Sequence, residues 1–164
     1  MGDLTTHPVL EIAIGTIGLV IVIVFHGTGV RLINRRYSAV WVKVDAATPH
    51  WHVNLLLVLV VTAFAVVHLV ETLICAVPMH QLGLLPNLRD SYYYVLEAYT
   101  TLGEGAVSLP ETWLLIGPII AMSGLFAFGW TASVLVGIMT EYSQLDRSRA
   151  RLAEKAKTGA EPEA

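Results

Sequence analysis

The stretch Thr100-Thr101-Leu102-Gly103-Glu104-Gly105, hereafter the strip, decides the predicted fold of this chain. It lies between a short helix candidate, residues 90–101, and a long uncharged apolar segment, residues 113–139. Irregular, glycine-bearing backbone is tolerated inside a membrane only where protein buries it or where it lines a water-filled path. The position of the strip therefore predicts a re-entrant segment that carries function.

The composition is that of a membrane protein. Of the 164 residues, 55% are hydrophobic and only 14% are charged, which is too apolar for an ordinary soluble domain. The net charge of -3 and the lack of a basic patch interleaved with aromatic residues exclude nucleic acid as a partner. Cys75 is the single cysteine, so no disulfide can form within the chain.

Three segments are long enough to cross a bilayer, which takes about 20 predominantly apolar residues. They are residues 9–25, 53–77 and 113–139. The segment 90–101 is only about half as long, so it can enter the membrane without crossing it, with Asp90 or Ser91 as its N-cap. We therefore expect an all-α membrane protein with three transmembrane helices and one re-entrant helix.

The basic residues predict how the chain is oriented. Of ten Lys and Arg residues, four lie between the first two spans, five follow the third, and only Arg89 lies on the opposite side. Cytoplasmic segments are enriched in Lys and Arg. The loop 27–52 and the charged tail 143–164 are therefore expected in the cytoplasm, and the N-terminus outside. The first apolar run is expected to stay uncleaved, because Asp3 and no basic residue precede it.

The strip has the backbone chemistry of a cation path. A row of carbonyls that replaces a cation's hydration shell needs alternate residues in the left-handed conformation, which glycine adopts at little steric cost. Gly103 and Gly105 supply this alternation, and Thr101 adds a hydroxyl at the inner end. The negative C-terminal dipole of the preceding helix favours cations there. The predicted ion-binding residues are Thr101, Leu102, Gly103, Glu104 and Gly105.

The strip resembles the Thr-Thr-Val-Gly-Tyr-Gly selectivity filter of the potassium channel superfamily. Glu97 stands four residues before Thr101, where some bacterial members carry a glutamate behind the filter, and Thr100 matches the first threonine of the motif. The stretch 124–129 resembles the Gly-x-x-x-Phe-Gly pattern of the family's inner helix. The resemblance covers residues 53–142, as the outer helix, pore helix, filter and inner helix of a small bacterial two-transmembrane-type pore module. The segment 1–52, with the first span, lies outside it.

The resemblance implies a passive cation channel in a bacterial inner membrane. One strip cannot encircle an ion, so four identical chains are expected to assemble around it. The implied ligands are K⁺ or Na⁺ in the filter, with no other cofactor and no enzyme activity. On the inner helix, Gly124 is expected to be a gating hinge or a site of close helix packing. Leu125, Phe128 and Ala132 are expected to line the cavity and gate.

Two residues depart from the family's pattern. Glu104 stands where potassium channels carry tyrosine, and Ala106 stands where many carry aspartate. Nonselective relatives carry an aspartate at the tyrosine position, so Glu104 predicts a pore with only a weak preference for K⁺ over Na⁺. The alternative is a K⁺ channel in which the Glu104 side chain hydrogen-bonds behind the filter in place of the tyrosine.

His68 and Glu71 lie three residues apart on one face of the second span. Ionisable residues inside a span are costly and are candidates for function by default. One interpretation is a proton-sensitive pair, since histidine titrates near neutral pH. The interpretation that we favour is a hydrogen-bonded brace to a tyrosine of the pore helix, which offers Tyr92, Tyr93, Tyr94 and Tyr99. No third ligand is placed by sequence, so no metal site is predicted.

Two other classes of function stay open. The chain could be a non-conducting subunit of a membrane enzyme complex, because the family's tyrosine and aspartate are missing; the retained Thr101, Gly103 and Gly105 argue against this. It could also be a metal or quinone enzyme built on its six histidines. The predicted topology argues against an enzyme, because it divides the histidines between the two faces and places His26 near His50 and His52 at the cytoplasmic interface.

Overall fold

The computed structural model describes residues 8–159, which form four α-helices and one 3-10 turn. In chain order these are α1 (Pro8–Trp41), α2 (His50–Gln81), α3 (Leu88–Tyr99), η1 (Glu111–Trp113) and α4 (Ile116–Thr158). No strand occurs among the described residues, so the expectation of an all-α chain is confirmed. Residues 1–7 of the predicted N-terminal segment and residues 160–164 of the predicted tail lie outside the described part.

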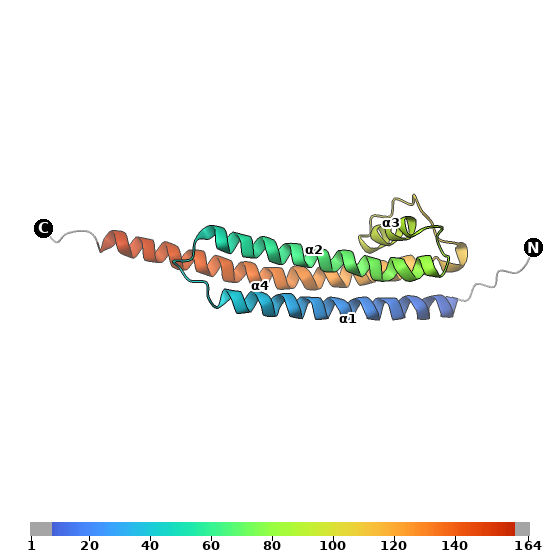
Figure 1. The fold of residues 1–164 in the computed structure, drawn as a ribbon, viewed down its shortest axis with the longest axis horizontal. Helices are drawn as coiled ribbons and strands as arrows, with labels where there is room; N and C mark the ends of the chain where they lie inside the picture. Colours follow the sequence, from blue (N-terminus) through green and yellow to red (C-terminus); the bar gives the residue numbers. More distant parts are fainter. Residues whose placement is uncertain (1–7, 160–164) are drawn as a thin grey trace, which may run out of the picture.

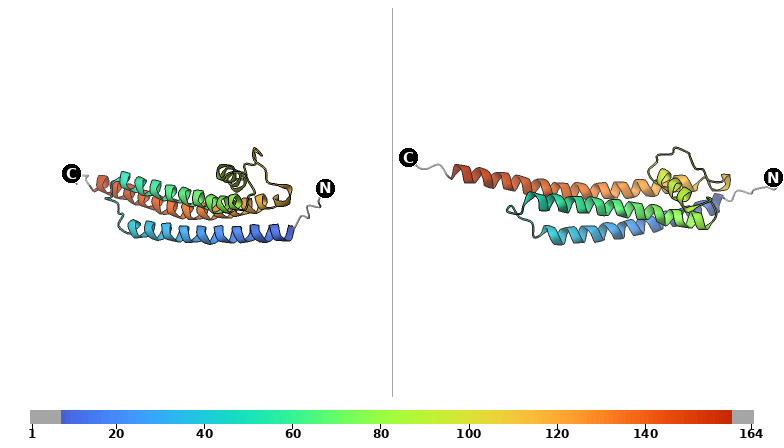
Figure 2. Two further views of the ribbon diagram at one scale, coloured as in Figure 1. Left: turned by 45° about the vertical axis from the view of Figure 1, so that its right-hand side comes forward. Right: turned by 45° about the horizontal axis from the view of Figure 1, so that its top comes forward.

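The long helices α1, α2 and α4 run side by side, and α3 lies at one end of this bundle (Figures 1 and 2). Helix α1 packs on both α2 and α4, whereas α3 packs on α2 and α4 from the side away from α1. The first and last described residues lie at opposite ends of the molecule (Figure 1).

Each long helix contains a stretch apolar enough to cross a membrane, so the chain is a membrane protein with three candidate spans. The helices are longer than the predicted spans. The 34 residues of α1 extend about 50 Å, more than the roughly 30 Å hydrocarbon core of a bilayer. The predicted loop 27–52 is wrong in its first part, because α1 continues as far as Trp41. Hydropathy marks where a helix leaves lipid, whereas its hydrogen bonds can continue into water.

The turn between α1 and α2 is fixed by side chains at its centre. The Asp45 carboxylate accepts hydrogen bonds from the hydroxyl and backbone N–H of Thr48 and from the N–H of Ala47, at 2.8, 2.9 and 3.0 Å. These donors, the Thr48 hydroxyl first, lower the pKa of Asp45. Arg149 of α4 donates to the carbonyl of Thr48 and to Nδ1 of His50. The continuation of α4 beyond residue 141 therefore ties this turn to the bundle.

Helix α3 starts at Leu88, two residues before the predicted start. Its N-cap is Asn87, whose side-chain oxygen accepts from the backbone N–H of Asp90 at 2.8 Å. Asp90 and Ser91, the predicted caps, lie in the first turn instead. An asparagine in extended conformation is as good a cap as aspartate, and the turn before it, not the polarity of the segment, decides which residue is used.

The core of the bundle is two apolar clusters separated by a polar layer. One cluster includes Val22 of α1 and Ala76 of α2, and the other includes Val30 of α1 and Phe64 of α2. Buried polar side chains lie between the clusters on each long helix; they are His26, Glu71 and Thr131. The layer therefore joins all three helices at one level.

Gly124 lets α4 approach the end of α3. A Cβ atom at this position would lie 2.0 Å from the carbonyl oxygen of Tyr99, far closer than any real contact. The close-packing interpretation therefore accounts for Gly124, within a helix that runs without interruption from Ile116 to Thr158. At Gly129, five residues later, a Cβ would meet nothing within 4 Å.

We expect Gly124→Ala to destabilise the fold and Gly129→Ala to preserve it. The new methyl group at residue 124 must push α3 away from α4, and overpacking of this kind costs about 1–3 kcal/mol. At residue 129 the change should be neutral or stabilising by up to about 1 kcal/mol, because alanine is the better helix former. Unfolding in detergent, followed by circular dichroism, measures both. Equal losses in the two variants would contradict the packing described here.

Candidate functional site

The strip begins where α3 ends, and its second residue has unusual backbone angles. The N–H of Leu102 donates to the carbonyl of Glu97 at 2.9 Å, and that of Thr101 to the carbonyl of Ala98 at 3.0 Å. This pair of bonds is the Schellman motif, whose left-handed residue is usually glycine. Here it is Thr101, with φ of 59°. The same motif ends α2 with a glycine, Gly83. A threonine in this conformation is strained, and such strain is typical of functional sites.

Alternate residues of the strip share the left-handed conformation. Gly103 and Gly105 have φ of 63° and 74° and follow Thr101 at a spacing of two. The predicted alternation at the two glycines is confirmed, and it extends one residue further than predicted. In the single chain, residues 101–106 are exposed. Residues 103–109, all within the described part, make no backbone–backbone hydrogen bond.

The strip starts deep along the bundle. Tyr99, the last residue of α3, contacts Glu71, which lies ten residues before the end of α2. At 1.5 Å per helical residue this is about 15 Å along the axis of α2. The chain then returns to the end of the bundle at η1 and starts α4 (Figure 1). Helix α3 and the strip therefore descend beside α2 and return, without crossing the bundle.

The Glu104 side chain is bound to α3. The Tyr93 hydroxyl donates to its Oε2 at 3.1 Å. This bond, followed by desolvation, raises the pKa of Tyr93 to about 12, so the phenol remains a donor at neutral pH. The carboxylate is thus directed towards α3. The strip lacks the tyrosine of the potassium channel motif, but a hydrogen bond between the strip and α3 takes its place.

Glu97 and Thr100, the predicted supports of the strip, lie at the end of α3. Glu97 is buried, and its Oε1 has no hydrogen-bond partner among the described residues. It borders a hollow of about 260 Å³ between α3, the strip and the start of α4. The Thr100 hydroxyl donates to the carbonyl of Leu96 at 2.7 Å and so stabilises the last turn of α3.

The predicted gate residues lie on an exposed face of α4 in the single chain. Leu125 and Phe128 have exposed fractions of 61% and 41%, and Ala132 is also exposed. Phe128 packs partly inward, with its ring centroid 4.6 Å from that of His68 and 5.3 Å from that of Tyr99. This face is therefore free to meet another chain or a solvent-filled space.

Five side chains from all four helices form a closed hydrogen-bonded cycle, hereafter the polar ring. Glu71 contacts His26 Nδ1 at 2.8 Å and accepts from the Tyr99 hydroxyl at 2.5 Å. The Tyr99 oxygen lies 2.8 Å from His68 Nδ1. Thr131 Oγ1 closes the cycle at 3.2 Å from His68 Nε2 and 3.3 Å from His26 Nε2. The predicted brace from His68 and Glu71 to a tyrosine is confirmed, with Tyr99 as the partner.

The position predicted for His26 is wrong. It was expected at the cytoplasmic interface with His50 and His52, but it is fully buried between α1, α2 and α4. Because α1 runs on to Trp41, His26 lies at mid-helix, 15 residues before the helix end. The signal that could have identified it was the lack of any local partner for an imidazole in an apolar helix. Thr131 was missed as well, because it resembled the other small residues of α4.

His26, His68 and Glu71 are residue types that bind zinc, and one ligand atom from each lies within 4.8 Å of the others. The present geometry fits hydrogen bonds better. The contact of 2.8 Å between His26 and Glu71 is shorter than the separation of about 3.3 Å that two ligands 2.0–2.1 Å from one zinc ion require. Every nitrogen of the two imidazoles also has a partner within the polar ring.

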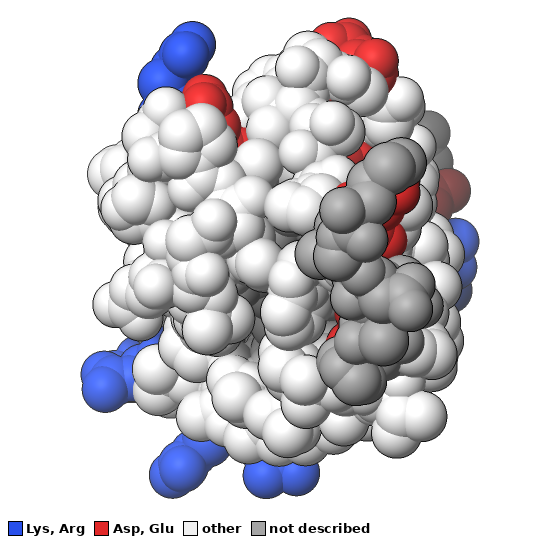
Figure 3. All heavy atoms as spheres, turned by 90° about the vertical axis from the view of Figure 1, so that its right-hand side faces the viewer, with Lys and Arg blue, Asp and Glu red and all other residues white. Residues whose placement is uncertain are grey.

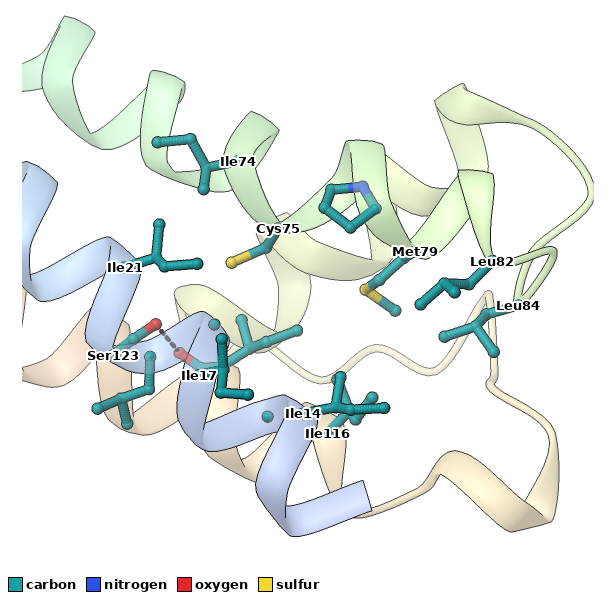
Figure 4. Close-up of a pocket in the computed structure, with 15 residues that line it drawn as sticks. Ile14, Ile17, Ile21, Ile74, Cys75, Met79, Leu82, Leu84, Ile116 and Ser123 are labelled. Atoms are coloured by element: carbon teal, nitrogen blue, oxygen red, sulfur yellow. Dashed lines mark hydrogen bonds between the residues drawn. The ribbon is translucent and has the colours of Figure 1, made fainter. Parts of the chain in front are cut away.

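A second cavity, of about 190 Å³, lies between α1, α2 and the first turns of α4 (Figure 4). Its walls are mostly aliphatic, and Cys75 of α2 is turned towards α1 there (Figure 4). The Ser123 hydroxyl at its edge is already bound to the carbonyl of Ile120 at 2.7 Å. The cavity offers no charged group and no free row of carbonyls, so it is not suited to a cation.

The end of the molecule that carries α3 and η1 is mostly uncharged (Figure 3). Acidic groups appear on this face, whereas the visible Lys and Arg side chains lie at its margins (Figure 3). Among the acidic residues near this end, Glu11 of α1 accepts a hydrogen bond from the backbone N–H of Leu115, at the start of α4. That contact fixes α1 to α4 beside the site.

No known family model, curated protein or solved structure matches the chain. The fold and the geometry of the site therefore carry the functional argument.

We expect Thr101→Gly to stabilise the fold and Thr100→Gly to destabilise it. Glycine relieves the left-handed strain at residue 101, which costs a threonine roughly 1 kcal/mol. At residue 100, where the backbone is right-handed, glycine loses about 0.5–1 kcal/mol in conformational entropy and removes the bond to Leu96. Unfolding midpoints in detergent compare the two. A loss at residue 101 as large as that at residue 100 would show that Thr101 is not strained.

Proposed function

We propose that the chain is the subunit of a passive cation channel of the potassium channel type, in which four copies surround one path. The observation that carries the proposal is the left-handed backbone at Thr101, Gly103 and Gly105 in an exposed segment. Such alternation turns successive carbonyls to one side, as a carbonyl-lined selectivity filter requires. K⁺ and Na⁺ are the ions that we expect to pass.

The proposed path gives the unpaired backbone of residues 103–109 hydrogen-bonding surroundings. Residues 103–109 make no backbone–backbone hydrogen bonds within the described chain, and lipid cannot satisfy them. A central path shared by several chains offers them water, ions and neighbouring protein. The C-terminal end of α3 directs its partial negative charge to the same place, which favours cations over anions.

A tetramer places the helices in consistent roles. Helix α3 serves as the pore helix, α4 as the inner helix and α2 as the outer helix. Helix α1 packs on α2 and α4 away from α3, so it lies on the lipid side of the assembly. With the basic segments in the cytoplasm, the strip opens outward, as in a channel of a bacterial inner membrane.

The bond between Tyr93 and Glu104 favours a pore that prefers K⁺. Sequence alone left open whether Glu104 weakens selectivity or supports the strip. The carboxylate accepts from Tyr93 at 3.1 Å and is thereby directed towards α3, as the supporting role requires. We therefore propose that this bond keeps the strip in a conformation that suits K⁺, through either the width of the path or the field of its carbonyls.

In a planar bilayer with K⁺ on one side and Na⁺ on the other, we expect a cation current whose reversal potential lies on the K⁺ side of zero. Tyr93→Phe removes the hydroxyl that holds Glu104, and the reversal potential should move towards zero, a several-fold loss in the permeability ratio. Tyr92→Phe is the matched control, because its hydroxyl makes only a 3.5 Å contact with the carbonyl of Leu69 on α2.

Two outcomes of this measurement would oppose the proposal. An unchanged permeability ratio in Tyr93→Phe would remove the hydrogen bond from the account of selectivity. The absence of current at all voltages and pH values, with purification as a one-to-one complex with a membrane enzyme, would favour the non-conducting subunit. A tetramer by native mass spectrometry is the assembly that conduction requires.

A further inference from the structure

We propose that the polar ring is a proton-binding site that holds one proton more than its five side chains carry in water at pH 8. The inference rests on the hydrogen-bond pattern and goes beyond the proposed channel function. All five links have hydrogen-bond length, between 2.5 and 3.3 Å. In a closed cycle each link needs one proton, so five protons are required.

The side chains themselves bring four protons. With Glu71 ionised and both imidazoles neutral, Thr131, Tyr99, His26 and His68 carry one each. The directions of the bonds show which part of the ring lacks the fifth proton. Tyr99 donates to Glu71, so His68 must donate from Nδ1 to the Tyr99 oxygen. Thr131 has one hydroxyl proton for two imidazole Nε2 atoms, so one of those atoms must donate to Thr131.

The fifth proton makes the ring neutral as a whole. Either His26 is an imidazolium that donates to a Glu71 carboxylate, or the proton lies on Glu71 and is donated to His26 Nδ1. Both forms satisfy all five links and differ only by transfer of one proton along the bond of 2.8 Å between these residues. Without the fifth proton, a carboxylate would be buried without a compensating charge, which is strongly unfavourable inside a membrane protein.

Within residues 8–159, the neighbours of the ring supply no other compensating charge. The titratable neighbour on α2 is Cys75, one turn from Glu71; α1 contributes His26 and α3 contributes Tyr99, both ring members. From α4 the ring meets Thr131 and the uncharged Phe128 and Trp130. Glu71 and His26 are fully buried, whereas the His68 side chain is 13% exposed, so the ring reaches the protein surface at His68.

The ring therefore couples folding to proton uptake above neutral pH. At pH 8 the unfolded chain has an ionised Glu71 and neutral histidines, so folding binds one proton per chain. Because the folded state then holds the extra proton, stability decreases as pH rises, and the unfolding equilibrium constant increases up to about tenfold per pH unit. The increase ends once the pH is high enough for the folded ring to lose its proton.

Glu71→Gln removes the need for the extra proton but keeps the hydrogen bonds of the ring. A glutamine donates from its amide nitrogen to His26 Nδ1 and accepts from Tyr99, so all five links form with both imidazoles neutral. Thr131→Val is the matched contrast: it keeps the shape of the side chain but removes two links. It leaves Nε2 of His26, which is buried, and Nε2 of His68, which is partly buried, without partners in the ring.

The test compares unfolding of the wild-type chain and the two variants in detergent, at fixed protein concentration between pH 7.5 and 9.5. We expect the wild-type unfolding constant to rise with pH several-fold more than that of Glu71→Gln, and Thr131→Val to unfold about tenfold more readily than wild type at pH 7.5. Equal pH dependence of the wild type and Glu71→Gln would overturn the proposal.

A second measurement needs no variant. Unfolding of the wild-type chain at pH 8 in weak buffer should release about one proton per chain, as reported by an indicator dye. Release of no proton would overturn the proposal. Stabilisation by Zn²⁺ that is reversed by EDTA and absent in Glu71→Gln would also overturn it, in favour of a metal site. Because these experiments measure folding and not conduction, their outcome is separate from that of the channel proposal.

Discussion

Backbone without hydrogen-bond partners cannot face lipid, and this constraint determines the rest of the structure. Residues 103–109 lack backbone partners in the described chain, so they need water, ions or another subunit beside them. Everything around the strip serves to hold it at one depth. Helix α3 lowers it beside α2, the Schellman motif at Thr101 reverses the chain, and η1 returns it to α4. The helices α1, α2 and α4 supply the apolar frame.

Two contacts at Tyr99 fix the depth of α3 in that frame. Its carbonyl lies against Gly124, where no larger residue fits, and its hydroxyl enters the polar ring through Glu71 and His68. Apolar surfaces slide past one another with little change in energy, especially in lipid, where no hydrophobic driving force holds helices together. A cycle of directional bonds between two apolar clusters permits one register only. Close packing and hydrogen bonds therefore both fix the position of the end of α3, directly before the strip.

The sequence was sufficient for features that depend on one segment at a time. It predicted the helices and the left-handed glycines Gly103 and Gly105. It also predicted one contact between segments, a tyrosine partner for His68 and Glu71, because the short helix offers four tyrosines. It failed for contacts that depend on how one helix is rotated relative to another. Around His26, helix α1 is apolar on all sides, so the pattern marks the imidazole as unusual but does not indicate that it faces α2 and α4. The cap at Asn87 and the conformation of Thr101 depend on single backbone angles, which residue preferences do not determine.

The support of the strip differs from the one that the resemblance implied. In the potassium channel pattern the strip carries the tyrosine; here α3 carries it, as Tyr93, and the strip carries the acceptor, as Glu104. Since the pKa of Tyr93 is raised to about 12, the phenol keeps its proton at any pH in which a cell lives. The Glu104 carboxylate is held towards α3 by this bond. In the channel that we propose, the direction of the Glu104 carboxylate therefore decides whether it supports the strip or faces the ion.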